Sequence, residues 1–386
     1  MPDAPPSLRI FVNPRRGTPG VTVLPAAGFR RARAEIASWP GYARTPLVPL
    51  PGVAAELGLG TLMVKDEAPR FGLGSFKALG GAYAVLGVVA GALARRGDAA
   101  AATAAELEAG LYAVAAARVT VCCATDGNHG RSVAWGARRF GAACHIFVHE
   151  GVSQGRIDAI AAFGAVIHRV PGTYDAAVRE AAATAVREGW LVVSDTSWPG
   201  YTEVAREVMQ GYRLMADEAL DQWTGPPPTH VFIQAGVGGV AAAVSVQMRA
   251  RLDPAPAVVV VEPDQAACLM ASAEVQALNT VGGELDTIMA GLACGVPSLL
   301  AWQELERAAA AFVAIPDEAA VEAMRVLAAQ GVVSGESGAA GLGALMLICG
   351  SGVARAQLGL DATSRVLLFS TEGATDLDVY QALAGA

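Results

Sequence analysis

The stretch THVFIQAGVGGVAAAVSVQMRARL, residues 229–252, joins three kinds of local sequence. Its first six residues, THVFIQ, contain β-branched and aromatic side chains around an apolar centre, which is typical of a buried strand. A glycine-rich loop follows, and the alanine-rich remainder is typical of a helix. Glycine amides that turn inward at the start of a helix can hold a phosphate dianion without any basic side chain. We expect this role for Gly236, Val237, Gly238 and Gly239.

Two familiar nucleotide-binding patterns are absent from this loop. A dinucleotide loop needs GxGxxG with an acidic residue about 20 positions later, and a Walker loop needs Gly-Lys-Ser/Thr. Residues 235–239 read AGVGG and fit neither pattern. A tight turn without a ligand is the alternative interpretation, and glycines alone do not exclude it.

The alternation of strand and helix extends along the chain on both sides of this stretch. Short apolar runs recur between alanine-rich segments that favour helices. The runs are VTVCCA (119–124), HIFVH (145–149), VIHRV (166–170), WLVVS (190–194), AVVVVEP (257–263), FVAIP (312–316) and RVLLFST (365–371). Continuous apolar strands separated by helices indicate parallel sheets covered on both faces. The fold class is therefore α/β, and a length of 386 residues favours two lobes over one.

Composition narrows the class of protein. Hydrophobic residues make up 53% of the chain and charged residues 17%, which indicates a globular protein, and a net charge of −8 offers no binding surface for nucleic acid. The uncharged stretch Ala78–Ala94 is glycine-rich and shorter than the roughly 20 residues of a membrane span, so we expect a buried helix and no membrane contact. We find no signal peptide and expect a cytoplasmic protein. The six cysteines form no CxxC pair, which predicts that no metal is bound.

A polar loop, TDGNHG at 125–130, follows the run VTVCCA and precedes a segment of helical composition. Open parallel sheets bind ligands at the carboxyl ends of their strands, and amides at a helix N-terminus can hold a carboxylate. The loop therefore predicts a ligand site. Because Asp and Asn are also favoured in turns and at helix starts, an ordinary capped turn is the alternative.

Lys77 lies in the segment FGLGSFKALGGAY, between small or aromatic residues and the expected buried helix. Removal from water lowers the pKa of an amine and favours the neutral nucleophile that forms a Schiff base. The alternative is a surface lysine whose aliphatic part lies along the protein. The neighbouring motifs favour the reactive lysine.

The lysine segment, the GNH loop and the glycine loop resemble, in this order, the fold-type II pyridoxal 5'-phosphate (PLP) enzymes of the tryptophan synthase β family. Within that group the chain is similar to the diaminopropionate ammonia-lyases. The similar segments are KDEAPRFGLGSFKALGG, TDGNHGRSVAWGAR, DTSWPGYTEVAREVMQGY, QAGVGG, TIMAGLACG, SGESGAAGLGAL and FSTEGATD. The resemblance covers the chain from about Tyr42 to Asp376.

This resemblance implies two lobes, each an open twisted and mostly parallel sheet flanked by helices, with the active site between them. We expect residues 1–85 and 200–386 to form a large PLP-binding domain. Residues 86–199 would form a small domain that carries the TDGNHG loop. A homodimer is the usual assembly of the family.

The resemblance also implies roles for individual residues in cofactor binding. Lys77 would hold PLP as a Schiff base, and Asn128 would bond the ring hydroxyl of the cofactor. The glycine loop at 236–239 would bind the phosphate. A hydroxyl, from either Ser370 or Thr371, would face the pyridine nitrogen, and the sequence does not choose between the two.

Two carboxylates, Asp126 and Asp195, match functional aspartates of the diaminopropionate ammonia-lyases. An anionic wall attracts a substrate with a cationic β-amine, and a carboxylate can act as a general base. We expect Lys77 to take the Cα proton of an L-substrate and Asp126 that of a D-substrate, with Thr125 and His129 contacting the substrate. Either aspartate could instead cap a turn.

The expected reaction is elimination of the β-amine of 2,3-diaminopropionate, L and also D, to give pyruvate and ammonia. A serine/threonine dehydratase or a hydroxyaspartate ammonia-lyase of the same fold is the alternative enzyme, and a non-catalytic PLP-binding protein is the alternative of another class. Cys268 and Cys294 match positions that can pair in this family, so a reversible disulfide is a further hypothesis.

Overall fold

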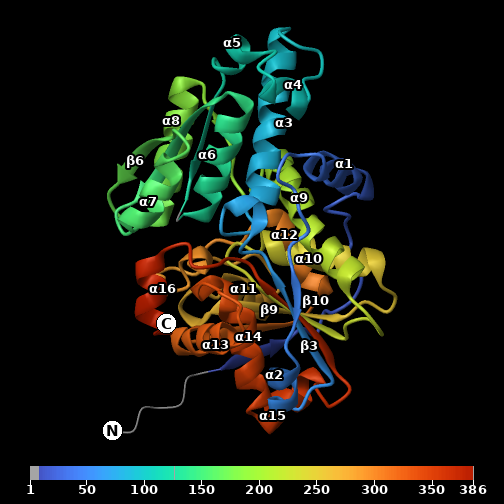
Figure 1. Ribbon diagram of the computed structural model, residues 1–386. Coiled ribbons are helices and arrows are strands. Elements are labelled where there is room, and N and C mark those ends of the chain that lie inside the picture. Colours follow the sequence, from blue (N-terminus) through green and yellow to red (C-terminus); the bar gives the residue numbers. More distant parts are fainter. Residues whose placement is uncertain (1–7, 126, 386) are drawn as a thin grey trace. The chain divides into compact units, whose positions relative to one another are not determined.

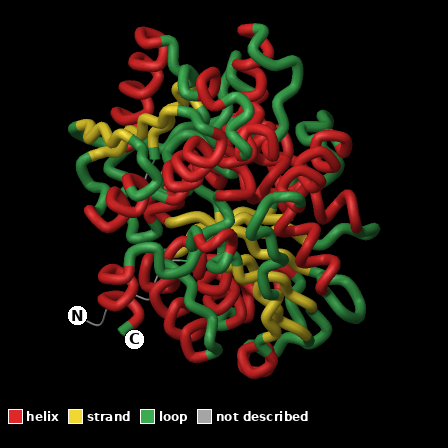
Figure 2. Tube along the Cα trace, turned by 45° about the horizontal axis from the view of Figure 1, so that its top comes forward, coloured by secondary structure: helices red, strands yellow, loops and turns green. Residues whose placement is uncertain are grey.

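The computed structural model describes residues 8–125 and 127–385. The chain divides into two compact units. The large unit comprises Met1–Pro25, Arg44–Ser75 and Arg213–Ala386, and the small unit comprises Ala26–Ala43 and Phe76–Tyr212. Each unit contains one sheet with helices around it (Figures 1 and 2). The assignment of functional domains with limits at residues 85 and 199 stays a prediction.

The sheet of the large unit has seven strands in the order β1-β10-β9-β8-β11-β3-β2. The five inner strands are parallel, and the two edge strands are antiparallel to their neighbours. The strands are β1 (Arg9–Val12), β2 (Leu47–Pro49), β3 (Thr61–Asp66), β8 (His230–Gln234), β9 (Ala257–Pro263), β10 (Ala309–Ile315) and β11 (Arg365–Ser370). The mostly parallel sheet confirms the expected α/β class.

Helices cover both faces of this sheet. The longer ones are α10 (Gly239–Arg251), α12 (Leu299–Ala308), α13 (Asp317–Ala329) and α14 (Glu336–Cys349). Shorter ones are α2 (Pro51–Glu56), η1 (Arg70–Gly72), η2 (Asp264–Ala266), α11 (Cys268–Val275), η3 (Ala290–Leu292), α15 (Gly352–Leu358) and α16 (Leu377–Ala384). A core of buried apolar residues joins α13 and α14 to one face, while α10 and α12 pack beside each other and contact β8 and β10.

The sheet of the small unit has four parallel strands in the order β6-β5-β4-β7. They are β4 (Thr120–Ala124), β5 (Ala143–His149), β6 (Val166–Val170) and β7 (Leu191–Val192). The helices are α1 (Ala26–Ala37), α3 (Ala78–Arg96), α4 (Ala104–Glu108), α5 (Ala113–Ala116), α6 (Asn128–Phe140), α7 (Gln154–Ala161) and α8 (Tyr174–Glu188). Helix α9 (Glu203–Gln222) runs through the limit between the units at residue 212.

The apolar runs of the sequence all become strands, although the limits of several differ by a residue or more, and two of these differences have a structural reason. Of WLVVS only Leu191 and Val192 form a strand, because β7 lies at the sheet edge and the chain then leaves the sheet towards Asp195. The strand containing FVAIP begins earlier, at Ala309. Alanine has a low strand propensity, so the sequence shows no sign of this extension, but these alanines are buried within the sheet.

Helix α3 (Ala78–Arg96) is the expected buried helix. Among the described residues it is long and apolar enough to cross a membrane by length and composition, but 67% of its most apolar window is buried inside the protein. That burial is typical of a core helix.

Candidate active site

Lys77 immediately precedes α3, and its side chain is held by an ion pair within the small unit. Its Nζ donates to Oδ2 of Asp195 at 2.5 Å, and the two side chains are only 20% and 12% exposed. The same nitrogen lies 5.3 Å from the ring centroid of Phe76 and 5.7 Å from that of Tyr212. The lysine is therefore shielded from water, as a Schiff-base lysine requires, and does not lie along the surface.

The small number of lysines also points to Lys77 as the candidate for cofactor binding. Lysine occurs at only two positions, Lys65 and Lys77. Lys65 is fully buried and donates three hydrogen bonds, to Thr45 O, Glu218 and Gln222. Lys77 is therefore the lysine whose side chain remains available for a cofactor aldehyde. A count of lysines in the sequence would have left two candidates, and the burial and hydrogen bonds of Lys65 exclude one of them.

Close helix packing places Lys77 at this position. A Cβ at Gly80 would lie 2.4 Å from Tyr212, and a Cβ at Gly81 would lie 2.3 Å from the hydroxyl of Ser132, so only glycine fits at either position. The hydroxyl of Ser132 donates to Lys77 O at 2.8 Å and accepts from Ala82 N at 3.1 Å. Ser132 thus fixes the start of α3. Sequence reasoning missed it because the contact spans 55 residues.

Asp195 follows the short strand β7 and is 9% exposed. Burial alone would raise the pKa of its carboxyl, but positive charge on His129 and Lys77 and the hydrogen bond from Lys77 bring the pKa below its ordinary value. Burial in turn lowers the pKa of the His129 imidazole, so at neutral pH Lys77 is the cation that keeps Asp195 ionised. The structure thus places an ionised carboxylate beside Lys77, and the catalytic roles of both residues stay predictions.

His129 presents a hydrogen-bond acceptor to the same site. Its Nε2 lies 2.8 Å from Val193 O, and because a carbonyl oxygen only accepts, Nε2 carries the proton. Its Nδ1 is then unprotonated and lies 3.8 Å from Oδ2 of Asp195. Nδ1 is buried and has no hydrogen-bond partner among the described residues. The pair of Nδ1 and Oδ2 is suited to a ligand that donates protons, such as an ammonium group.

Tyr201 holds the strand end that carries Asp195. Its hydroxyl donates to Val192 O at 3.0 Å and accepts from Ser194 N at 2.9 Å, and its ring stacks on Trp198 with centroids 4.2 Å apart. The phenol therefore replaces a missing neighbouring strand. The sequence shows no signal for this role, because it depends on where β7 ends.

The TDGNHG loop is organised by Thr125. The Thr125 hydroxyl accepts from the backbone N–H groups of Gly127 and Gly130, at 3.0 and 2.9 Å. Asn128 begins α6, so its side chain stands at the N-terminal end of that helix. Asp126 lies outside the described residues, and its role stays a prediction. Substrate contact by Thr125 and cofactor contact by Asn128 also stay predictions.

The glycine loop of the large unit has the form expected of an anion site. Gly238 precedes α10 with a left-handed φ of 95°, and a Cβ at Gly236 would lie 3.0 Å from Sγ of Cys294. The loop carbonyls face the protein, since Val237 O accepts from Ser298 N and Gly236 O accepts from Cys268 Sγ. In the described part of the chain, none of the four backbone N–H groups at 236–239 donates to a protein acceptor. These donors fit a phosphate.

The two candidate hydroxyls at the end of β11 are both held in place. Ser370 Oγ lies 2.9 Å from Ser334 Oγ, and Thr371 Oγ1 accepts from Nε2 of Gln234 at 2.8 Å. Because β8 and β11 are neighbours in the sheet, these hydroxyls and the glycine loop follow adjacent parallel strands. The choice between Ser370 and Thr371 stays open.

The cysteines are free thiols in the structure. Cys268 and Cys294 are both buried beside Gly236, and they do not form the disulfide that the resemblance suggested. Burial raises the pKa of the Cys268 thiol, which makes it a poor nucleophile. The described residues contain no cluster of three or more His, Cys, Asp or Glu side chains that could hold a metal ion.

Comparison with known proteins gives independent evidence on the family of this chain. The family model for pyridoxal-phosphate dependent enzymes matches residues 38–371. The chain is 39% identical to diaminopropionate ammonia-lyase of Escherichia coli K12 over 356 residues, 88% of this chain and 87% of the relative. It is also 39% identical to the enzyme of the same name from Salmonella typhimurium, over 89% of this chain and 88% of the relative.

Solved structures give the same result. The crystal structure of holo diaminopropionate ammonia lyase from Escherichia coli matches with a TM-score of 0.90 at 35% identity, covering 98% of this chain and 97% of that one. The structure of that enzyme in complex with D-serine matches with the same TM-score and coverage. The predicted lysine, glycine loop and hydroxyls therefore stand in a chain whose fold binds PLP in its relatives.

Proposed function

Because the chain belongs to the diaminopropionate ammonia-lyase family of pyridoxal-phosphate dependent enzymes, we propose that it converts 2,3-diaminopropionate to pyruvate and ammonia. Lys77 would hold PLP until the α-amine of the substrate takes its place, and the cofactor would then withdraw electrons from Cα of the substrate and make its proton acidic. The reaction is an elimination, in which the Cα proton and the β-amine leave and the remaining fragment hydrolyses to pyruvate and a second ammonia.

The residues that hold the cofactor would act through different groups. The amides of the 236–239 loop would bind the phosphate, and Asn128 the ring hydroxyl. Ser370 or Thr371 would face the ring nitrogen. A neutral hydroxyl holds a proton on that nitrogen less firmly than a carboxylate does, which favours elimination over transamination.

One observation favours an aminated substrate over a hydroxylated one. In the structure, Asp195 is neutralised by the ammonium group of Lys77 at 2.5 Å. When Lys77 holds the cofactor, Nζ is no longer an ammonium group that can donate to Asp195, and a buried carboxylate that has lost its partner is unfavourable by about 3–5 kcal/mol. The β-ammonium of diaminopropionate would restore the pair and could also donate to Nδ1 of His129. A serine hydroxyl brings no such charge.

Lys77 would also move the proton. The amine of an L-substrate would release the Nζ of Lys77, which would then be free to take the Cα proton on its own side of the substrate. For a D-substrate the Cα proton faces the other way, and a second base is required.

A panel of amino acids tests this function. Pyruvate would be measured with L- and D-2,3-diaminopropionate and with L- and D-serine, and 2-oxobutanoate with L-threonine. We expect diaminopropionate to be the preferred substrate. Turnover of serine or threonine without turnover of diaminopropionate would replace the proposal with a dehydratase, and no turnover by the PLP-bound protein would favour a non-catalytic PLP-binding protein.

Asp126→Asn tests the base for the D-isomer. We propose from the family resemblance that Asp126 takes the Cα proton of a D-substrate, so this change should lower the rate with D-diaminopropionate about 100-fold or more and the rate with the L-isomer far less. Initial rates of pyruvate formation with each isomer are the measurement. Asp98→Asn, on the exposed surface of the small unit, is the control. Equal loss with both isomers would reject two bases.

We also propose a cytoplasmic homodimer, as the family resemblance implies. Light scattering of the holoenzyme should give twice the 39.3 kDa mass of the chain. A mass of one chain would contradict the dimer without affecting the proposed reaction.

A further inference from the structure

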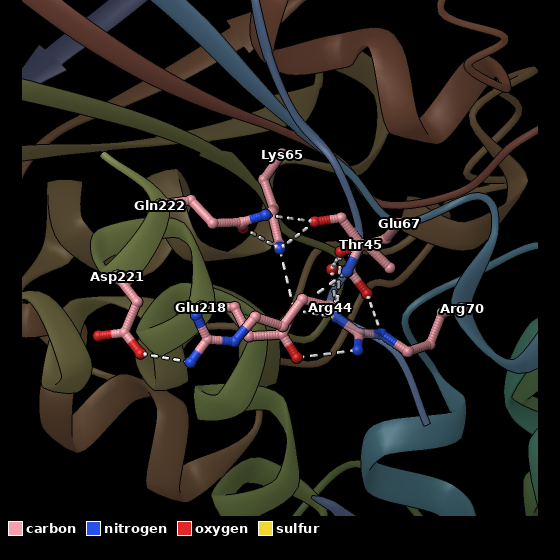
Figure 3. Close-up of polar contacts among 8 residues, drawn as sticks. All are labelled: Arg44, Thr45, Lys65, Glu67, Arg70, Glu218, Asp221 and Gln222. Carbon is pink, nitrogen blue, oxygen red and sulfur yellow. Dashed lines mark hydrogen bonds and ion pairs between the residues drawn. The ribbon is translucent and has the colours of Figure 1, made fainter. Parts of the chain in front are cut away.

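A cluster of buried charges lies in the large unit, among residues to which no role has been given (Figure 3). Its members are Thr45, Lys65, Glu67, Arg70, Glu218 and Gln222. The four charged side chains, two positive and two negative, are between 0% and 2% exposed. We call this set the charge cluster.

Arg70 is the centre of the charge cluster. On one side its Nε and Nη2 donate to both oxygens of Glu67, each at 2.8 Å. On the other side its Nη1 and Nη2 donate to both oxygens of Glu218, at 2.9 and 2.8 Å. The planar guanidinium thus joins two carboxylates in a fixed geometry, which an ammonium group could not do.

The remaining members complete this arrangement. Lys65 Nζ donates to Glu218 at 2.9 Å, to Thr45 O at 2.7 Å and to Gln222 at 2.7 Å, so all three of its protons are used. The hydroxyl of Thr45 donates to Glu67 at 2.6 Å. Buried ion pairs often stabilise a fold no better than apolar side chains of the same volume. The cluster is therefore better explained by the geometry it imposes than by stability.

The segment that the charge cluster holds leads to Lys77. Residues 67–74 form an arch whose two ends are tied to the end of β11, because Glu67 N donates to Ser370 O and Gly373 N donates to Gly74 O, both at 2.9 Å. Between these ties the backbone is irregular, and Phe71 has a left-handed φ of 51°. Such a conformation in a bulky residue persists only where its surroundings enforce it. Arg70, the preceding residue, is the one clamped by two carboxylates.

We propose that the charge cluster positions Lys77 for its reaction with PLP, by fixing the arch, residues 67–74, whose C-terminal end is three residues before Lys77 in the chain. The proposal rests on the proposed function, in that Lys77 is the PLP lysine. Arg70 links the arch to Glu218 of α9, and α9 also carries Tyr212, whose ring lies beside Nζ of Lys77. Bond formation depends steeply on the placement of the reacting atoms, so a loosened arch slows it.

Arg70→Lys tests the positioning role, because it keeps the positive charge and removes the fork. Apoprotein would be mixed with PLP, and the growth of the visible band of lysine-bound cofactor would give a rate and a dissociation constant. We expect the rate to fall about tenfold or more, with a similar loss in kcat and a change in KM below about twofold. The melting temperature of the apoprotein would show whether the variant folds as the parent does.

Arg251→Lys is the matched control. Arg251 also joins two carboxylates of α9, Asp217 and Asp221, but it is 37% exposed and these carboxylates are not members of the charge cluster. It should capture PLP at the parental rate. Equal slowing in both variants, or a lower melting temperature of Arg70→Lys with parental PLP capture, would overturn the proposal.

Thr45→Val covers the case in which Arg70→Lys does not fold. It removes only the hydroxyl contacts to Glu67 and Arg70 and keeps every charge, so it should slow PLP capture in the same direction by a smaller factor. Parental capture by folded Thr45→Val would contradict the proposal. If Lys77→Ala retained the visible band, the choice of lysine itself would be wrong, and this outcome is distinct from a failure of positioning.

Discussion

Replacing Lys77 by alanine should abolish pyruvate formation, with a loss in kcat of more than about 10³-fold, because it removes both the anchor of the cofactor and the base for the L-substrate. The visible absorption band of lysine-bound PLP should disappear as well. Absorption spectra of the parent and the variant, mixed with PLP in equal amounts, are the measurement.

The composition of the chain makes this test decisive. Lys65 is the only other lysine, and it is enclosed by Thr45, Glu218 and Gln222. Borohydride reduction of the parent with PLP, followed by peptide mapping, should therefore label Lys77 alone. A visible band in Lys77→Ala, or a label on Lys65, would show that the anchor has been assigned to the wrong residue.

Replacing Asp195 by asparagine should lower kcat/KM for L-diaminopropionate by at least about 100-fold, because it removes the charge that pairs with the β-ammonium group. Asparagine keeps the size of the side chain and an acceptor oxygen, so the change is electrostatic. Steady-state kinetics of pyruvate formation are the measurement.

The matched control for Asp195→Asn is an uncharged substrate in the same variant. Any activity of the parent with L-serine should change far less, below about tenfold, because the serine hydroxyl carries no charge for Asp195 to meet. An equal loss with both substrates would mean that Asp195 acts on a step common to both, such as holding Nζ of Lys77, and would contradict its role in selecting the amine.

Local sequence patterns predicted much of the fold. Every apolar run became a strand, and the glycine loop became the connection between β8 and α10. Both could be predicted because the conformation of such segments is determined largely by the residues within them. The edge strands β1 and β2 and the inner strand β3 were not predicted. The edge strands β1 and β2 are too short to give a clear apolar run in the sequence. Strand β3 was missed because it ends in the charged residues Lys65 and Asp66, of which Lys65 belongs to the charge cluster.

The candidate site was predicted in part, because residue types and motifs can be recognised in the sequence whereas long-range contacts cannot. Residue types and a family resemblance selected Lys77, His129 and Asp195, and the structure brings these three together. Their supporting residues could not be found in this way. Ser132 and Tyr201 bind backbone atoms, so their contribution depends on where Lys77 and the end of β7 come to lie, and not on a pattern of neighbouring residues.

The protonation of His129 illustrates the same limit. The sequence places it in a polar loop, but only the bond from Nε2 to Val193 O shows that Nδ1 faces Asp195 without a proton. An acceptor beside a carboxylate is a feature of ammonium recognition, and it arises from residues 66 positions apart in the sequence.

The ratio of ammonia to pyruvate tests the central claim most directly. Diaminopropionate contains two amino groups, and elimination followed by hydrolysis releases both, whereas serine releases one. We predict that the PLP-bound protein, given L-2,3-diaminopropionate, forms ammonia and pyruvate in a ratio of two to one. Pyruvate from serine with a ratio of one to one, and none from diaminopropionate under the same conditions, would contradict the account.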